Sequence, residues 1–301
     1  MAGTMTDGAR RLEAELVLDG RWELGEGPIW DTRESELVWV DIMGDAVLRW
    51  RPGDERARAL PTPLDIGSVA VRRGGGYVAA LADGFWVVDA GSTEWRPFAR
   101  VEADRPDLRF NDGKCDPTGR FLAGSMAYDK RAGAGGFYRL DPDGTVEQLL
   151  DGITISNGLT WTADGRTLYY IDTPTRTIDV FDYDLPTGAL SDRRPHLVLP
   201  DGEPGSLDGM TMDTDGGLWV ALWNGSKVVR FAPGGGVDVV VDLPVSHVTS
   251  CIFGGPDLTD LYITCAWSEL TDDERAAEPH AGSLFRVRPG VRGYPPVEFA
   301  G

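Results

Sequence analysis

Residues 156–173 read SNGLTWTADGRTLYYIDT and contain the unit from which the fold can be read. A short apolar stretch ends at Trp161, an Asp-Gly turn occupies residues 163–166, and a strand rich in β-branched and aromatic residues begins at Leu168. This order of strand, turn and strand predicts a β-hairpin. Asn157 stands at the start of the first strand, although asparagine is depleted in β-strands. Its position therefore indicates a role other than forming the sheet.

The same unit recurs six times along the 301 residues. Successive second strands begin 40, 44, 47, 50 and 43 residues apart, at Leu37, Tyr77, Phe121, Leu168, Leu218 and Leu261. A third strand follows each of these, as in GGFYRL (135–140), and an edge-like fourth strand usually comes next, as in VDVVVD (237–242). Four short antiparallel strands at this period are typical of a propeller blade. We therefore predict an all-β fold, a six-bladed β-propeller with four antiparallel strands per blade.

No break in composition separates two domains. We expect residues 11–301 to form a single propeller domain and residues 1–10 to be a flexible N-terminal tail. Closing the ring requires a terminal strand in the last blade, and two segments could provide it: AELVLDG (14–20) or PPVEFAG (295–301). The one stretch with helical character, TDDERAAE (271–278), is expected to lie in a loop.

The composition limits the environment and the partners. Lys and Arg number 29 and Asp and Glu 48, so the formal net charge is −19, which disfavours nucleic acid as a partner. No secretory signal and no apolar run of the roughly 20 residues that a membrane span needs are visible. Three cysteines without framework spacing fit a reducing compartment, and pairing of Cys251 with Cys265 stays open, although free buried thiols are expected. We expect a cytoplasmic protein without a membrane partner, as a monomer or weak homo-oligomer.

Two common catalytic patterns are missing from the sequence. No G-x-S-x-G segment of a serine hydrolase occurs, and the glycine-rich run at 133–136 precedes a strand rather than a helix, which excludes a dinucleotide loop. The histidines, His196, His247 and His280, have no metal-type spacing and are expected at surface or loop positions.

Four polar residues occupy one register when the units are aligned on the turn after the first strand. Counted five residues back from the turn positions, they are Glu26, Asn111, Asn157 and Asp208. The other two units offer about Gly67, and Thr249 or Ser250. First strands line the central channel of a propeller, so these side chains should meet at one height around the axis. Each alone could merely cap a strand, but four converging oxygens favour one divalent cation: Ca²⁺, Mg²⁺ or Mn²⁺, with Zn²⁺ or Fe²⁺ also possible.

The motifs around these residues resemble the gluconolactonase/regucalcin (senescence marker protein) family of six-bladed sugar lactonases. The matching segments run in the family's order from about residue 15 to the C-terminus: GEGPIW (25–30), RFNDGKCDPTGR (109–120), ISNGLTW (155–161), DVFDYDLPTG (179–188), LDGMTMDTDGGLWVA (207–221) and TSCIFGG (249–255). The resemblance implies one divalent metal ion at the channel end, with three ligands: Glu26, Asn157 and Asp208. It also implies that Arg109 and Asn111 hold substrate hydroxyls. The family's acidic substrate contact follows an AGSM-like strand, where MAYDK makes Asp129 the nearest counterpart, with Tyr128 beside it.

The resemblance implies a metal-dependent lactonohydrolase that converts a sugar-acid lactone, of the aldonolactone or gluconolactone type, to the aldonate. In this hypothesis the metal polarises the ring carbonyl, and Asp208, both ligand and base, takes the proton from the attacking water. Two alternatives stay open at this stage. One is a promiscuous esterase or organophosphate hydrolase on the same scaffold, and the other is a propeller that binds Ca²⁺ or a protein without turnover.

Overall fold

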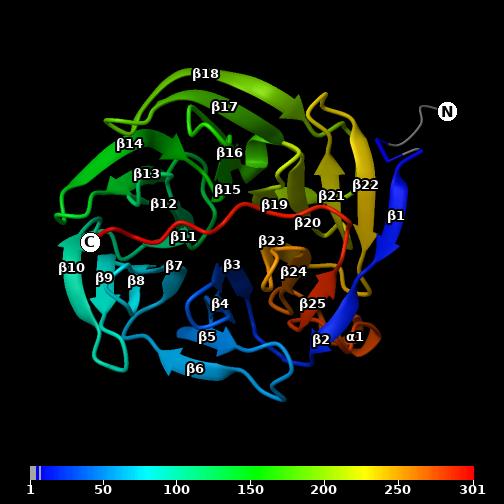
Figure 1. Ribbon diagram of the computed structural model, residues 1–301, viewed down its shortest axis with the longest axis horizontal. Coiled ribbons are helices and arrows are strands. Elements are labelled where there is room, and N and C mark those ends of the chain that lie inside the picture. Colours follow the sequence, from blue (N-terminus) through cyan, green and yellow to red (C-terminus); the bar gives the residue numbers. More distant parts are fainter. Residues whose placement is uncertain (1–4, 7) are drawn as a thin grey trace.

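The protein is a six-bladed β-propeller, which confirms the predicted fold. The computed structural model describes residues 5–6 and 8–301, and its six sheets surround a central axis (Figure 1). Each sheet contains four strands joined as antiparallel hairpins, and one sheet gains a fifth strand. We number the blades 1 to 6 in chain order. In each of them successive hairpin strands run from the axis outwards, and N-terminal strands of the chain are added at the outer edges of blades 5 and 6 (Figure 1).

The strands of blades 1 to 3, from the axis outwards, are β3 (Gly25–Asp31), β4 (Glu36–Asp41), β5 (Ala46–Trp50) and β6 (Arg58–Pro61); β7 (Ile66–Val71), β8 (Tyr77–Leu81), β9 (Gly84–Val88) and β10 (Arg96–Arg100); β11 (Leu108–Cys115), β12 (Phe121–Ala127), β13 (Gly135–Leu140) and β14 (Val146–Ile153). Those of blades 4 and 5 are β15 (Ser156–Trp161), β16 (Thr167–Asp172), β17 (Thr177–Asp184) and β18 (Ala189–Val198); β19 (Ser206–Met212), β20 (Leu218–Trp223), β21 (Lys227–Phe231) and β22 (Val237–Asp242). Blade 6 contains β23 (Val248–Gly254), β24 (Asp260–Cys265), β25 (Leu284–Val287) and β2 (Glu15–Leu18). A 3-10 turn, η1 (Thr173–Thr175), follows β16.

The ring is closed by the N-terminal part of the chain. β2 pairs antiparallel with β25 and forms the outermost strand of blade 6, which confirms the first of the two predicted closures. β1 (Arg10–Glu13) pairs parallel with β22 and adds the fifth strand to blade 5. The predicted tail includes residues 1–4 and 7, which lie outside the described residues, and Arg10 already belongs to β1.

The C-terminal segment has a different role from the second predicted closure. After β25 the chain crosses the face of the propeller over the central axis (Figure 1). It adds no strand to blade 6. Its end is fixed to blade 2, because Phe299 N donates to Val71 O at 2.8 Å and Arg73 N donates to Phe299 O at 2.9 Å. This segment therefore covers one end of the channel.

The six innermost strands share an irregularity at one height. In every blade the pairing between the first and second strands shifts register near the N-terminal end of the innermost strand, for example between Glu26 and Ile29 in blade 1 and between Asn157 and Leu159 in blade 4. β-Bulges redirect side chains and are frequent next to functional sites. Here they lie at the register position that the sequence repeat singles out.

Glycine at this height allows neighbouring blades to approach closely. A Cβ atom on Gly158 of β15 would lie only 2.6 Å from the carbonyl oxygen of Asp208 in the next blade. A Cβ atom on Gly67 of β7 would lie 2.4 Å from the carbonyl carbon of Phe110. Only a residue without a side chain tolerates these distances. Gly158, which follows Asn157, and Gly67 therefore serve the packing of the channel wall.

Residues 271–278 form a short helix, so the expectation of a loop there is wrong. α1 (Asp272–Ala277) follows Thr271, whose hydroxyl accepts a hydrogen bond from Glu274 N, while the Glu274 carboxylate accepts one from Thr271 N. This capping box satisfies two N–H groups that a helix start leaves free. Acidic residues in the first turn add a favourable interaction with the helix dipole.

Two other expectations can be compared with the structure. All three cysteines are buried and free, as expected. His247, in the loop before β23, is buried rather than at the surface, and its ring nitrogens contact Ser268 O and Asn224 Oδ1 at 2.9 Å each. Its ring stacks on Trp223 with a centroid separation of 4.0 Å, so it has a structural role between blades 5 and 6. In the part of the chain that the structure describes, no helix is long and apolar enough to cross a membrane.

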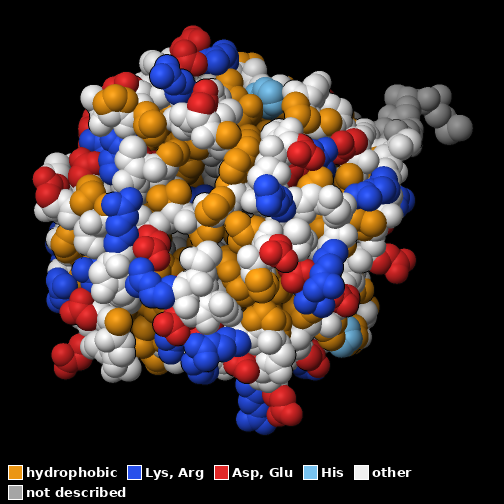
Figure 2. All heavy atoms as spheres, in the orientation of Figure 1, with side chains coloured by type: hydrophobic (Ala, Val, Ile, Leu, Met, Phe, Trp, Pro, Cys, Tyr) orange, Lys and Arg blue, Asp and Glu red, His pale blue; other side chains and the backbone are white. Residues whose placement is uncertain are grey.

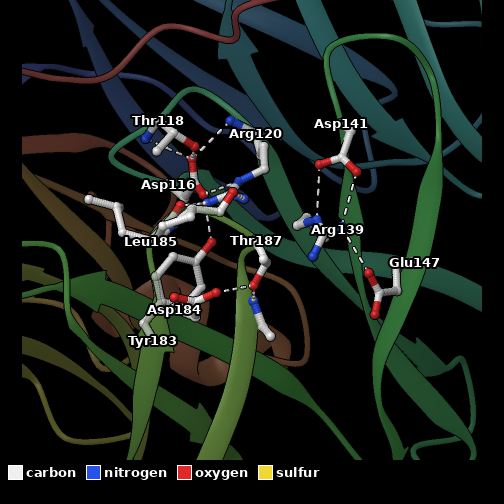
Figure 3. A network of polar contacts seen from close by, with 12 residues as sticks. Asp116, Thr118, Arg120, Arg139, Asp141, Glu147, Tyr183, Asp184, Leu185 and Thr187 are labelled. Atoms are coloured by element: carbon white, nitrogen blue, oxygen red, sulfur yellow. Dashed lines mark hydrogen bonds and ion pairs between the residues drawn. The ribbon is translucent and has the colours of Figure 1, made fainter.

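The aspartate at the turn after an innermost strand can join two blades, as Asp116 shows (Figure 3). Its carboxylate is fully buried. Oδ1 accepts hydrogen bonds from Thr118 N and Arg120 N at 2.9 Å each. Oδ2 accepts from Arg120 Nε at 2.5 Å and from the Tyr183 hydroxyl of blade 4 at 2.6 Å. One side chain thus fixes its own turn and the neighbouring blade.

Replacing Asp116 should destabilise the propeller strongly. Asp116→Ala leaves the buried Arg120 guanidinium without its counter-charge, and breaking a buried pair in this way costs about 3–5 kcal/mol. Urea unfolding should show this loss of the free energy of unfolding. The matched control is Asp184→Ala nearby, because Asp184 is exposed and its side chain accepts only a local hydrogen bond from Thr187. A surface substitution of this kind should change the free energy of unfolding by no more than about 0.5 kcal/mol. Equal losses in the two variants would contradict the assigned role of Asp116.

Candidate metal centre

The four residues of the common register meet at one end of the channel. Glu26, Asn111, Asn157 and Asp208 come from β3, β11, β15 and β19, and none is more than 6% exposed. Asn111 Nδ2 donates to Asn157 Oδ1 at 3.0 Å. The carboxyl groups of Glu26 and Asp208 act on each other's pKa, which places them side by side. We call this group the polar ring.

The orientation of Asn157 explains why an amide stands at the start of β15. Its Nδ2 donates to Thr173 Oγ1 at 2.8 Å, and this hydroxyl in turn donates to Leu207 O at 2.9 Å. The amide nitrogen therefore points away from the polar ring and donates to Thr173. The amide oxygen faces Asn111 in the polar ring. A hard cation coordinates the oxygen of an amide. The side chain thus presents the atom that a metal site requires.

Asp112 is a member of this site that the repeat alignment missed. It is 6% exposed, and its charge raises the pKa of both Glu26 and Asp208. The alignment assigned one residue per strand to the polar ring, whereas the bulge in β11 places two residues, Asn111 and Asp112, opposite a single residue of β12. The aspartate in NDG, directly before a glycine, was the available signal.

Burial concentrates negative charge in this site. Burial, with the charge of Asp112 as a second cause, raises the pKa of Glu26 to about 8. Burial and the neighbouring charges of Glu26 and Asp112 raise the pKa of Asp208 well above its ordinary value. The pKa of Asp112 is also raised by burial. Like charges disfavour ionisation of each other in a poorly solvated place, so a bound cation would stabilise all three carboxylates.

Arg109 stands beside the polar ring on the same strand as Asn111. Its side chain is buried, and Nη1 donates to Asn111 Oδ1 at 2.8 Å and to Phe110 O at 3.0 Å. Both hydrogen bonds that the guanidinium makes to described residues come from this one nitrogen. Nε and Nη2 therefore remain available for another acceptor. The structure thus brings together the two residues that were expected to hold substrate hydroxyls.

Asp129 is not brought to this site. It lies in the turn after β12, its side chain is 64% exposed, and it accepts a hydrogen bond from Arg131 Nη1 at 3.0 Å. Its neighbour Tyr128 is 44% exposed, and its hydroxyl donates to Asp65 Oδ2 at 2.5 Å. β12 ends at Ala127, and the turn that follows directs Asp129 into solvent. The expected role of Asp129 has no support in this geometry.

The donor set fits a divalent cation. Asp208 Oδ1 is buried and has no hydrogen-bond partner among the described residues, which is costly for a carboxylate oxygen unless another ligand satisfies it. Two carboxylates and an amide whose oxygen faces the polar ring supply oxygen ligands of the kind that hard cations prefer: Glu26, Asp208 and Asn157. Within residues 5–6 and 8–301 no three His, Cys, Asp or Glu side chains form a metal-type group. A cation here would therefore rely on the amide oxygen as well as on carboxylates.

These features define a β-propeller with a carboxylate and amide centre at one end of its channel. The chain belongs to the SMP-30/Gluconolactonase/LRE-like family, whose model matches residues 24–267. It is 40% identical over 297 residues to regucalcin of Xenopus laevis, covering 96% of this chain and 99% of the relative.

Solved structures agree with this assignment. A luciferin-regenerating enzyme matches with a TM-score of 0.89 and 30% identity, over 96% of this chain and 99% of that chain. A calcium-binding protein, regucalcin, from Agrobacterium tumefaciens matches with a TM-score of 0.93 and 26% identity, over 97% and 99% of the two chains. The family predicted from the sequence motifs is therefore confirmed.

Adding a divalent cation should raise the melting temperature of the EDTA-treated protein. A ligand present at 100 times its Kd stabilises the folded state by about 2.7 kcal/mol. Scanning fluorimetry with Ca²⁺, Mg²⁺, Mn²⁺ and Zn²⁺ in separate titrations would measure the shift. Asp208→Asn should reduce it, and without metal this variant should melt no lower than the wild type, because one of three buried like charges is gone.

Asp129→Asn is the matched control and should keep the full metal-induced shift. If Asp129→Asn loses the shift while Asp208→Asn keeps it, the cation binds outside the polar ring.

Proposed function

We propose that this protein is a metal-dependent hydrolase that opens sugar-acid lactones to the corresponding aldonates. Membership of the SMP-30/Gluconolactonase/LRE-like family supports a lactone-hydrolysing enzyme. The observation that carries the proposal is the unpartnered, buried Asp208 Oδ1 in a ring of oxygen donors, with the free guanidinium nitrogens of Arg109 beside it. A cation site next to a polyol-binding pair is what hydrolysis of a hydroxylated lactone requires.

Each part of the site has a distinct task in this proposal. A divalent ion held by Glu26, Asn157 and Asp208 would supply Lewis acidity to the lactone carbonyl. Arg109 Nε and Nη2, together with the Asn111 amide, would bind the ring hydroxyls and fix the orientation of the carbonyl. Tyr128, hydrogen-bonded to Asp65 at the edge of the site, replaces the expected acidic contact and would bound the space for the sugar.

Asp208 is the proposed general base. Water adds to the carbonyl carbon while its proton passes to the Asp208 carboxylate. The ring C–O bond then breaks as Asp208 returns this proton to the leaving ring oxygen, which gives a carboxylic acid and a hydroxyl group. Asp208 is 5% exposed in the polar ring, and a carboxylate positioned in this way can accept a proton from the attacking water. Its burial also excludes bulk water from the proton transfer.

A second function, calcium binding without turnover, is favoured by the description of the Agrobacterium tumefaciens relative as a calcium-binding protein. An assay of pentono- and hexonolactones with a pH indicator separates the two. Metal-stripped protein is reloaded with single cations, and hydrolysis should disappear on stripping and return with at least one metal. Metal binding without hydrolysis of any lactone would favour the binding protein, and cleavage of aryl esters or organophosphates alone would favour the promiscuous hydrolase.

Arg109→Lys should impair lactone turnover while preserving metal binding. Lysine keeps the positive charge near Glu26 but loses the fork of guanidinium donors. A hydrogen bond to a charged group is worth about 1.5–3 kcal/mol, so kcat/KM should fall roughly 10- to 100-fold. The matched control is Arg131→Lys, because Arg131 is exposed and contacts Asp129 and Asp107. Unchanged kcat/KM in Arg109→Lys would place Arg109 outside the substrate site.

Asp208→Asn should separate metal binding from proton transfer. The amide keeps the size of the side chain and an oxygen for coordination, so cation affinity should weaken but survive. It accepts no proton, and loss of a general base costs about 10²- to 10⁴-fold in rate. Lactone hydrolysis is followed while each variant is titrated with metal, with Asp129→Asn as the control of unchanged activity. Recovery of wild-type kcat at saturating metal would show that Asp208 is only a ligand.

A further inference from the structure

A second cavity occupies the other end of the channel. Its volume is about 280 Å³, and it is lined by residues of all six innermost strands and by the C-terminal segment. We call it the lower chamber. Its wall includes residues three positions after the polar ring, such as Lys114, Thr160 and Thr211. At about 3.3 Å per residue, these lie roughly 10 Å along the axis from the metal centre.

The wall of the lower chamber is mainly apolar. Ile29, Val71, Trp161, Ile252 and Phe253 contribute to it from four different blades. Such a surface favours a ligand with an apolar body, because burying apolar area gains about 25 cal/mol per Å². The volume lies near the lower limit for ligand pockets, about 300 Å³, and suits a compact molecule of one ring.

Three polar side chains in the wall of the chamber have donors available for a ligand: Lys114, Thr160 and Thr211. Lys114 Nζ donates to Met210 O at 2.8 Å and forms no ion pair with any described residue. Lys114 therefore reaches from blade 3 to blade 5 and places an ammonium group at the inner end of the chamber. Thr160 and Thr211 are 7% and 6% exposed, and the described residues accept or donate no hydrogen bond at their hydroxyls. The charge of Asp112 acts on the Lys114 ammonium, but no carboxylate among the described residues forms an ion pair with it. An ammonium and two hydroxyls at one end of an apolar space complement a carboxylate.

The backbone of the segment that covers the chamber forms hydrogen bonds to described residues at its two ends, and the Tyr294 and Glu298 side chains add contacts with Thr214 O and Arg33. Gly293 N donates to Leu258 O at 2.9 Å, and Phe299 N donates to Val71 O at 2.8 Å. Between these anchors the backbone of residues 294–298 makes no hydrogen bond within the described chain, and Pro295 and Pro296 have no N–H to donate. Figure 2 shows apolar side chains across the centre of this face and hollows beside them. A small molecule can enter beside this segment without breaking a sheet.

We propose that the lower chamber is a second binding site, separate from the metal centre, for a small organic monocarboxylate with an apolar body. The carboxylate would bind Lys114 Nζ and the hydroxyls of Thr160 and Thr211. The apolar part would fill the space between Phe253, Trp161 and the C-terminal segment. The site takes a different chemistry from the polar ring, where three carboxylates repel an anion and attract a cation. This inference does not depend on the proposed lactonase activity.

Titration with phenylacetate tests the proposal. Trp30 and Trp161 line the chamber, so saturable binding should change the tryptophan fluorescence of the full-length protein. The titration is also done in Asp208→Asn, where binding of a carboxylate to a metal ion at the polar ring is weakened. The same affinity is expected there. Phenylacetamide, which has the same shape without the charge, should bind roughly 10- to 100-fold more weakly.

Two variants assign the binding to the chamber. Lys114→Met should weaken phenylacetate binding roughly 10- to 100-fold and leave phenylacetamide binding almost unchanged. In Thr160→Val the new side chain has the same size as threonine but lacks the hydroxyl, so phenylacetate binding should weaken about 2- to 10-fold. This variant tests the proposal if Lys114→Met does not fold. The proposal is overturned if the wild type shows no saturable binding up to 20–50 mM (about the solubility-limited range), or if both variants bind with wild-type affinity.

Discussion

Contact between the backbones of neighbouring innermost strands is the constraint on which the whole channel depends. Where Gly158 meets the carbonyl of Asp208 and Gly67 meets that of Phe110, there is no room for even one additional carbon atom. The strands can approach this closely only because each is bulged there, which turns the adjacent polar side chain towards the axis. The same feature therefore narrows the channel and gathers its oxygen donors. A larger residue at these glycines would separate the blades and the donors together.

The electrostatics of the site follow from this narrowness. Three carboxylates lie in a space from which water is largely excluded, so their pKa values rise and a cation becomes the favourable way to satisfy them. The two positive side chains next to these carboxylates, Arg109 and Lys114, both belong to β11. Arg109 precedes the polar ring on this strand and Lys114 follows it, so one strand carries a guanidinium on the substrate side and an ammonium on the chamber side. The surface charge of −19 contributes little to this pattern, because solvent screens it.

The sequence was sufficient for the fold and for the convergence of four polar residues on the axis, and insufficient for the details of their surroundings. The repeat period and the hairpin turns are local signals, and the polar register repeats with them, so blade number and four ring residues could be predicted. Asp112 could not, because a bulge changes which residues face the axis and leaves no mark in a simple count. Asp129 was assigned by its charge, whereas the turn after β12 directs it into solvent. The burial of His247 depends on contacts between blades that no single segment reveals.

The same six innermost strands line both ends of the channel, but the two ends differ in the residues that face the axis and in the segment that covers them. Every innermost strand begins at the end of the channel that holds the polar ring. The bulges narrow the channel there, and polar side chains fill it. At the other end the strands have diverged, apolar residues from all blades face a wider space, and the C-terminal segment covers it instead of joining a blade. Lys114 marks the boundary, since its bond to Met210 O joins β11 and β19 across the axis. The ammonium group thus faces carboxylates on one side and an apolar space on the other. A propeller channel with one polar and one apolar end can hold two ligands of opposite charge without either entering the site of the other.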